Sequence, residues 1–399
     1  MATRRVNRSV VLVTDADQRA ALAVVRSLGR AGHKVIVGGQ RRRSLAGASR
    51  YCSARILLPD SLTQPGEFAT EVSAAVAREN VNVLVPITES SLLAILARRS
   101  ELGECLVPFA DLATFRRVSD KAEVLRVEAG EGIAIPAQTV LETGGAPLPP
   151  EIPPFPLVIK PSRSVTTADG NSRKHGVVHV ADRPALDEAL AAMEPSAYPL
   201  MLQQRIVGPG VGIFLLMWDG KVRAQFAHRR LREKPPSGGV SVYRESIAAD
   251  ASLVERSRML LTSLNWQGVA MVEYKIDAAT GTPYLMEING RFWGSLQLAI
   301  DAGVDFPRLL LEVAQGSGPA SPPDWRVGVR SRWWWGDVDH LLAMFRRSPA
   351  VLALPPGHPG RWKTLVDFIV PRSANRNETL QFDDPMPFFV ETLEWLQGL

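Results

Sequence analysis

One stretch, residues 268–295, constrains the fold of this chain more than any other. Two runs of β-branched, aromatic and apolar residues flank the turn Ala278–Gly281, which predicts a β-hairpin. Glu273 and Glu287 are equidistant from Thr280, so a hairpin symmetric about that residue places the two carboxylates opposite each other. Their Cβ atoms would then lie about 5 Å apart. Because opposed like charges are destabilising, we expect a positive charge between them.

The same face of the predicted hairpin carries further polar groups. Strand alternation puts Asn289 and Arg291 on the side of Glu287. Two carboxylates, an amide oxygen and a guanidinium suit Mg²⁺ bound to a phosphate chain, since Mg²⁺ prefers oxygen ligands and a guanidinium offers a fork of donors to an anion. A solvated strand face, with Lys275 neutralising Glu273, is the alternative, and the hairpin alone does not decide between them.

Composition limits the class of protein. The 399 residues suggest two or three compact units, and contents of 46% hydrophobic and 22% charged residues are typical of globular proteins. The formal charge of +5 is a mild excess that favours anionic substrates. The basic clusters Arg4–Arg5 and Arg41–Arg43 have no interleaved aromatic residues, which argues against nucleic-acid binding. Cys52 and Cys105 form neither a disulfide framework nor a metal-ligand spacing, which favours a reducing compartment.

The N-terminal region predicts an α/β unit. The apolar run Val10–Val13 is too short for a signal peptide, and no run approaches the ~20 residues of a membrane span, so we expect a cytoplasmic protein without a membrane partner. A strand at this run, a helix over 18–30 and a strand over 35–37 predict an open parallel sheet. The turn Thr14–Asp17 has no glycine and carries two acids, which disfavours a nicotinamide dinucleotide.

A second unit combines a helix over 67–79 with a strand over 81–85. Thr88 and Glu89 follow at the carboxyl end of that strand, where open sheets bind ligands, so both are candidate substrate-binding residues. The alternative is that Thr88 is the N-cap of the next helix, and both interpretations stay open.

Two lysines occupy electrostatically unusual positions. Asp120 and Glu123 have the spacing of a capping box, which puts Lys121 in the first turn of a helix, where the helix dipole disfavours a cation. Lys160 ends an apolar strand, where its charge needs a partner or water. A phosphate ligand would explain both positions, although Lys121 could also reach solvent. A polar loop over 162–174 follows, and Gly176 closes it.

The basic run Arg229–Lys234 precedes the turn Pro235–Gly239. It could cradle a carboxylate or an acyl phosphate, or it could be a charged surface strand. On the first interpretation Arg232 is a candidate catalytic residue. The candidate substrate-binding residues of the turn are Ser237, Gly238 and Gly239.

Together these elements resemble the ATP-grasp ligases. The hairpin and its ending Glu287–Arg291 resemble the C-terminal half of that fold, Ser119–Lys121 resembles its phosphate-contacting element, and Lys160 with the following loop resembles its lysine strand and mobile phosphate-covering loop. The family resemblance implies a mixed α/β and α+β fold, with a Rossmann-like pre-grasp domain over 1–115. An ATP-grasp domain of two lobes would follow over 116–315, and a C-terminal appendage over 316–399.

The segment Leu202–Gly208 is similar to the one that lines the adenine pocket in that family, where main-chain groups near Gln204 and Ile206 would contact the base. The family usually has one acid at the position of Gln204 and another near Val211 to hold the ribose, and both are missing here. The ribose contacts are therefore not predicted.

The resemblance implies an ADP-forming ligase that joins a carboxylate to an amine or a thiol through an acyl phosphate, related to the carbamoyl-phosphate synthetase and biotin carboxylase group. A carboxylase of the biotin-carboxylase type and a non-catalytic nucleotide-binding module are the alternatives. The implied cofactors are ATP and two Mg²⁺ ions, with Mn²⁺ as a substitute. The implied partners are small-molecule carboxylate and amine substrates, with a homodimer left open.

The resemblance assigns roles residue by residue. The metal ligands would be Glu273, Glu287 and Asn289. The ATP-binding residues would be Lys121, Lys160, Gly170, Gly176, Gln204 and Ile206. The catalytic residues would be Arg291, Lys160 and Arg232. Trp333–Trp335, in the appendage, are predicted to pack against the main body.

Overall fold

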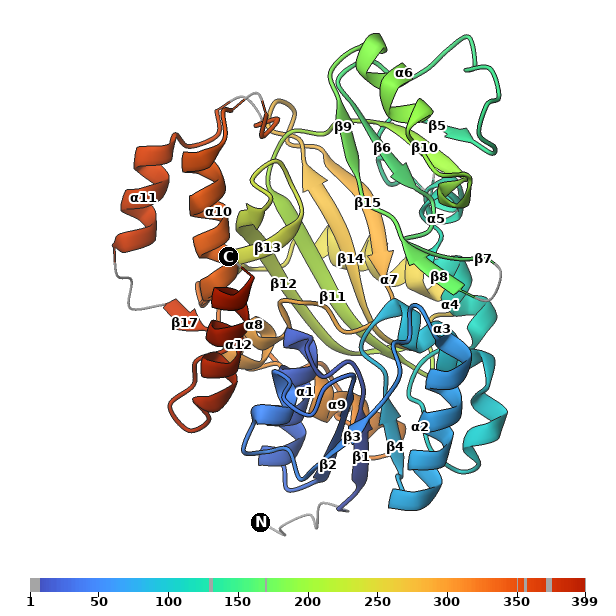
Figure 1. Ribbon diagram of the computed structural model, residues 1–399, viewed down its shortest axis with the longest axis vertical. Helices are drawn as coiled ribbons and strands as arrows, with labels where there is room; N and C mark the ends of the chain where they lie inside the picture. Colours follow the sequence, from blue (N-terminus) through green and yellow to red (C-terminus); the bar gives the residue numbers. More distant parts are fainter. Residues whose placement is uncertain are drawn as a thin grey trace.

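A parallel sheet forms the N-terminal part of the fold (Figure 1). The computed structural model describes residues 8–128, 132–168, 171–349, 351–354, 357–370 and 375–398. The sheet has the strand order β3 (Ala54–Leu57), β2 (Lys34–Gly39), β1 (Val10–Val13), β4 (Val83–Val85). The connecting helices are α1 (Arg19–Arg30) and α2 (Pro65–Glu79), followed by α3 (Glu89–Ala97), α4 (Leu112–Ser119) and α5 (Lys121–Glu128). The predicted open parallel sheet is therefore confirmed, with element ends shifted by at most two residues.

A small antiparallel sheet lies at the upper right of Figure 1. Its strand order is β5 (Gln138–Leu141), β10 (Leu200–Gln204), β6 (Leu157–Pro161), β9 (Val178–Val180), and α6 (Arg183–Ala191) packs on it. The separate hairpin β7 (Val165–Ala168) and β8 (Asn171–Lys174) lies between this sheet and the N-terminal part (Figure 1).

A seven-stranded sheet occupies the centre of the molecule (Figure 1). Its strands, in spatial order, are β15 (Pro283–Asn289), β14 (Gly268–Ile276), β11 (Gly210–Trp218), β12 (Lys221–Lys234), β13 (Val240–Ser246), β16 (Arg330–Arg332) and β17 (Asn375–Asn377). The helices of this part are α7 (Ala251–Ser263), α8 (Leu296–Ala302) and α9 (Phe306–Ala314). Among the described residues, no helix combines the length and the apolar character needed to span a membrane.

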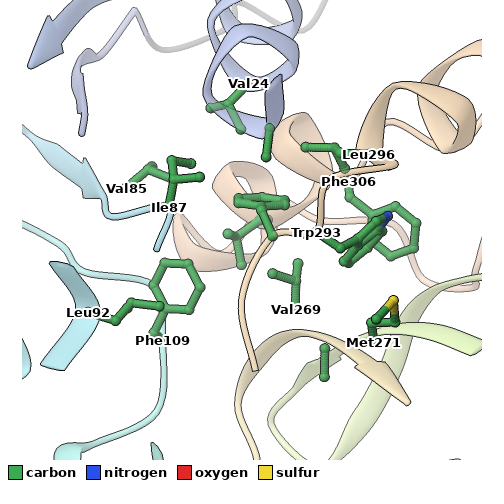
Figure 2. Packing of buried hydrophobic residues seen from close by; sticks show 14 of the residues in the cluster. Val24, Val85, Ile87, Leu92, Phe109, Val269, Met271, Trp293, Leu296 and Phe306 are labelled. Carbon is green, nitrogen blue, oxygen red and sulfur yellow. The ribbon is translucent and has the colours of Figure 1, made fainter. Parts of the chain in front are cut away.

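The hydrophobic core is continuous between the N-terminal part and the central sheet. Figure 2 shows Val85, Ile87 and Phe109 on one side of this cluster, and Val269 and Trp293 on the other. All of these side chains are buried. Burial of apolar area at about 25 cal/mol per Å² is the main force holding the two parts together.

The C-terminal residues complete the central sheet. They supply β16 and β17, together with α10 (Trp334–Arg346), α11 (Arg361–Ile369) and α12 (Met386–Gln397). Trp335 stacks on Trp395 of α12, with ring centroids 4.1 Å apart, and Trp334 packs on Phe368, so both pack within the C-terminal part and not against the main body as predicted. Trp333 does contact the main body, because the guanidinium of Arg19 in α1 lies 3.9 Å from its ring centroid.

Residues 378–384, which we call the clasp, join the C-terminal part to α1. Arg26 of α1 is fully buried, and its Nε donates to the carboxylate of Asp384 at 2.8 Å. The same guanidinium donates to the backbone carbonyls of Glu378, Thr379 and Asp384. The carboxylate of Glu378 pairs with Arg19 of α1 and Arg244 of β13. The clasp thus ties the N-terminal sheet to the central sheet through buried ion pairs.

Candidate functional site

The predicted site residues meet in a pocket of about 440 Å³ between the small sheet and the central sheet, which we call the cleft. Its lining includes the following predicted residues: Lys121, Lys160, Gly176, Gln204, Ile206, Ser237, Gly238, Gly239, Glu273, Glu287, Asn289 and Arg291. Gly170 lies outside the described residues. The structure therefore brings most of the candidate residues together from segments that are far apart in the chain.

The hairpin β14–β15 forms the floor of the cleft. Glu273 pairs directly with Glu287, so the predicted opposition of the two carboxylates is confirmed. The hairpin is not symmetric about Thr280, although that symmetry was expected. Tyr274 pairs with Leu285, and Met286 is the extra residue of a β-bulge. The backbone carbonyl of Met286 accepts a hydrogen bond from Lys160 Nζ at 3.3 Å. The bulge therefore both restores the pairing of the acids and gives Lys160 a partner.

Positive charges flank both acids, as expected. Glu273 pairs with Arg230 of β12, whose guanidinium also contacts Glu233 at 2.7 Å. Glu287 lies 3.5 Å from Lys121 Nζ. In the alternative interpretation Lys275 neutralises Glu273: its charge does act on that carboxylate, but Lys275 Nζ lies 3.5 Å from the carbonyl of Ile206, and Arg230 makes the ion pair with Glu273.

The two carboxylates have opposite pKa shifts. Burial raises the pKa of Glu273, although Arg230 opposes this. Burial also acts to raise the pKa of Glu287, but the charges of Lys121 and Lys160 outweigh it and lower the pKa to about 2. Glu287 is therefore ionised over the whole working pH range, as a metal ligand or a partner of cations must be.

Asn289 and Arg291 extend the acid pair along one face, as strand alternation predicted. Asn289 Nδ2 donates to Glu287 at 2.9 Å, and Arg291 donates to the side-chain oxygen of Asn289 at 3.0 Å. Among the described residues, no three His, Cys, Asp or Glu side chains are arranged to hold a metal. Two carboxylates and one amide oxygen nevertheless fit Mg²⁺, which usually completes its shell with substrate phosphates and water.

The two lysines lie on the opposite wall. Lys121 Nζ donates to the hydroxyl of Ser164 at 2.7 Å, so the residue that precedes β7 contacts the first turn of α5. Asp120 accepts from the backbone of Glu123 at 3.2 Å, which is half of the predicted capping box. Burial lowers the pKa of Lys160 to about 8. A buried cation of this kind favours an anionic ligand, because the ligand would restore the charge balance.

Gln204 and Ile206 line the far end of the cleft, beside Val158 and His179. The backbone N–H of Gln204 donates to Ala137 at 2.8 Å, so it is used within the small sheet. Burial lowers the pKa of His179 to about 4, which keeps its ring neutral. The charges of Arg205 and Lys275, which also line the cleft, act on His179 too, so basic side chains are present at this end.

A second pocket, of about 410 Å³, adjoins the cleft at the carboxyl ends of the N-terminal strands, and we call it the side pocket. Thr88 and Glu89 line it. Thr88 caps α3 by accepting from the backbone of Ser91, so it is a helix cap and also a pocket residue. Burial raises the pKa of Glu89, although the charge of Arg291 opposes it. The residues shared by the two pockets are Ser164, Glu287, Asn289, Arg291 and Gly294.

The candidate catalytic residue Arg232 lies outside both pockets. Its guanidinium makes two hydrogen bonds of 2.6 Å to the buried carboxylate of Asp337 in α10. Register shifts on either side of Arg232 turn it away from the cleft, which Arg230 and Glu233 line instead. The prediction for Arg232 is therefore corrected to Arg230. The basic run pointed to the correct strand, but strand alternation could not identify the correct arginine.

A family model described as ATP-grasp in the biosynthetic pathway with Ter operon matches residues 196–336. A sequence search of curated proteins found no match. Among solved structures, the L-amino acid ligase from Bacillus licheniformis is similar, with a TM-score of 0.60, 20% identity, and 78% of this chain and 75% of that chain covered.

Two further structures have comparable similarity. Biotin carboxylase from Campylobacter jejuni, in a complex with β,γ-ATP, has a TM-score of 0.61 at 15% identity and covers 80% of this chain and 74% of its own. N5-carboxyaminoimidazole synthetase from Staphylococcus aureus, complexed with ADP, has a TM-score of 0.60 at 12% identity. The match covers 81% of this chain and 82% of that chain. At these identities the similarity establishes the fold alone.

Proposed function

We propose, from the ATP-grasp fold of this chain, that it is an ATP-dependent, ADP-forming ligase that joins a small-molecule carboxylate to an amine. One observation carries the proposal: the opposed acids Glu273 and Glu287 lie beside the cations of the cleft. A hydrogen bond joins Glu287 to Asn289, and another joins Asn289 to Arg291. Phosphoryl transfer needs this combination of hard ligands and positive charge. The proposed domains are residues 1–115, 116–315 and 316–399.

The nucleotide would lie along the cleft. Lys121 and Lys160 would hold its phosphates, and the end beside Gln204 and Ile206 would take the adenine. Glu273, Glu287 and Asn289 would hold one or two Mg²⁺ ions, or Mn²⁺. When bound, such ions would neutralise the negative charge of the phosphates during transfer. The solved structures that share this fold include an L-amino acid ligase and a biotin carboxylase, which supports a ligase or carboxylase reaction here.

Arg291 would hold the reacting carboxylate. It lies where the cleft and the side pocket meet, within reach of both. A carboxylate is a poor electrophile, and attack of its oxygen on the γ-phosphorus gives an acyl phosphate and ADP. An amine then attacks the acyl carbon and expels phosphate. Arg291 would stabilise the anionic intermediate, and Thr88 and Glu89 would line the approach of the amine.

An ADP-release screen over paired acids and amines tests this proposal. With an active acid, ATP and hydroxylamine, we expect a hydroxamate with stoichiometric ADP and phosphate. Arg291→Ala should reduce hydroxamate formation by about 100-fold, the usual cost of one such stabilising group, with little change in ATP affinity. Arg308→Ala, which removes an exposed arginine paired with Glu312, is the matched control.

Other products would indicate a different intermediate or a different function. Release of AMP and pyrophosphate would replace the acyl phosphate by an acyl adenylate. ATP hydrolysis stimulated by bicarbonate alone would indicate a carboxylase. Nucleotide binding without turnover across the whole panel would indicate a binding module.

The pKa of Lys160 predicts a pH dependence of nucleotide binding. Because the folded pKa is about 8, the ammonium loses its proton as pH rises through that value, and ADP and ATP should then bind progressively more weakly. The unfolded chain keeps this proton up to about pH 10.4, so burial of Lys160 costs stability below pH 8 and less above it. Titration of ADP affinity between pH 7 and pH 9.5 measures the effect.

Lys160→Arg is the informative variant, since a guanidinium stays charged throughout this range. The fall in affinity above pH 8 should be absent in it. Lys160→Ala should bind ADP and ATP weakly at every pH. An unchanged pH profile in both variants would contradict the role of Lys160.

A further inference from the structure

One end of the cleft contains buried polar groups that the proposed reaction does not use. It lies over β12 and β13, beyond Arg230, and we define it as the recess lined by His228, Ser241 and Trp293. His228 is 1% exposed, Trp293 2% and Ser241 8%. Within the described residues, neither ring nitrogen of His228 has a hydrogen-bond partner, and the same holds for Ser241 Oγ and Trp293 Nε1. Leaving such groups unpaired is costly, which indicates that a ligand supplies their partners.

The recess lies on the same face of the central sheet as the two acids. Across the sheet, Glu273 pairs with Gly212, and Gly212 pairs with His228, so the imidazole lies in the same row as the acid pair. A side chain at Gly212 would have its Cβ 2.6 Å from the Phe214 ring and 3.0 Å from the His228 ring. Glycine at this position therefore leaves room for both rings.

Aromatic packing fixes the positions of both rings. The His228 ring packs edge-on against Phe214, with centroids 4.7 Å apart, and Phe214 lies 4.3 Å from the Trp293 ring. Figure 2 shows Trp293 held in the core beside Phe306 and Met271. The polar atoms of the recess are therefore carried by rings with little freedom to turn toward other partners.

The chemistry of these groups restricts the ligand. Burial and the charges of Arg230 and Arg244 keep the pKa of His228 well below its usual value, so the imidazole is neutral and offers one donor and one acceptor. A carboxylate only accepts hydrogen bonds and would leave the acceptor nitrogen unpaired. An ammonium only donates, and the two arginines would repel it. An uncharged group that both donates and accepts satisfies the ring.

Resting on the proposed ligase function, we propose that the recess binds the body of the carboxylate substrate through a hydroxyl or carboxamide group. His228 is the specificity-determining residue, and Ser241 and Trp293 supply further hydrogen bonds. The Ser237–Gly239 turn and Arg291 also line the cleft, so the reacting carboxylate would lie between the recess and the hairpin. The enzyme would then distinguish acids by a polar group distant from the reaction.

The test uses straight-chain acids of increasing length that end in a carboxamide, a hydroxyl, a methyl, a carboxylate or an ammonium group. Calorimetric titration into the Mg-ADP complex measures binding without turnover, and ADP release with hydroxylamine measures reaction. At the best chain length, we expect the carboxamide or hydroxyl acid to be favoured about 10-fold or more over the methyl acid, and further over both charged acids.

His228→Phe should abolish this preference by weakening the polar acid 10- to 100-fold while the methyl acid and ADP bind as before. A purely structural role would weaken all acids alike. Ser241→Ala removes one hydroxyl without adding volume, and it should lower the same ratio even if His228→Phe does not fold. Ser331→Ala is the control, because Ser331 Oγ is also buried without a partner but lies outside the cleft.

The outcomes separate the two proposals. Acids that bind with the polar preference but give no ADP support the recess and contradict the ligase function. Turnover without a polar preference, or a preference that survives in both His228→Phe and Ser241→Ala, overturns the recess proposal and leaves the ligase function intact. Failure of every acid to bind the Mg-ADP complex also overturns it.

Discussion

Glu287→Gln is expected to lower turnover by at least about 100-fold, because it removes the charge on which the proposed phosphate and metal contacts converge. Glu287 faces Glu273 across the hairpin, accepts from Asn289 and lies 3.5 Å from Lys121. With a pKa of about 2 it is ionised whenever the protein is folded. The amide keeps the shape but leaves Lys121 and Lys160 without their shared counter-charge. ADP release, together with Mg²⁺-dependent ATP binding, measures the loss.

Glu255→Gln is the matched control, since Glu255 is an exposed acid paired only with Arg258 on α7 among the described residues. It should leave both turnover and ATP binding unchanged. Glu287→Gln should lose part of the free energy of unfolding, because Lys121 and Lys160 lose the charge that lowers the pKa of Glu287. Its circular dichroism spectrum without denaturant should still match that of the wild type, which separates a lost ligand from a lost fold. Wild-type turnover in Glu287→Gln would contradict the assignment of the acid pair.

Asp384→Asn is expected to reduce the free energy of unfolding by about 3 to 5 kcal/mol, the usual cost of breaking a buried ion pair. Asp384 is 1% exposed, and its carboxylate accepts hydrogen bonds from Arg26 Nε, the Ser49 hydroxyl and the backbone N–H of Arg50. The amide leaves the fully buried guanidinium of Arg26 without its counter-charge. Urea unfolding followed by circular dichroism measures the change.

Asp383→Asn provides the comparison one residue away. Asp383 pairs with Arg30 at 2.8 Å, but both side chains are substantially exposed. Exposed pairs contribute about 0 to 1 kcal/mol, so this variant should unfold almost as the wild type does. Equal losses in the two variants would show that the clasp acts through its backbone conformation and not through the buried charge.

Local patterns were sufficient to predict the N-terminal sheet and the opposed acids. The alternation of residues 268–289 identifies the hairpin and the face that its polar residues share. The same alternation failed at Arg232, because the register shifts of β12 depend on how β13 pairs with it. It also missed the bulge at Met286, whose position follows from the ladder and not from the turn. A register is a property of two strands, and a single strand's sequence does not contain it.

The recess and the clasp could not be predicted from the sequence, for a different reason. His228 directly precedes the basic run Arg229–Lys234, and its significance comes from Gly212 and Trp293, which are distant in the sequence. Arg26 interrupts the apolar pattern of α1 and resembles an ordinary surface arginine until the clasp covers it. The three-residue strands β16 and β17 are too short to produce a periodic signal.

The clasp also bears on the order in which the molecule is assembled on the ribosome. Arg26 and Asp384 are 358 positions apart, so α1 leaves the ribosome long before the residues that cover Arg26. Domains generally fold from the N-terminus as the chain emerges, and the surface of α1 around Arg26 must therefore stay open to water until the clasp has been made. A chain interrupted before residue 384 would keep this surface uncovered permanently, which would make incomplete copies easier for proteases to recognise than finished ones.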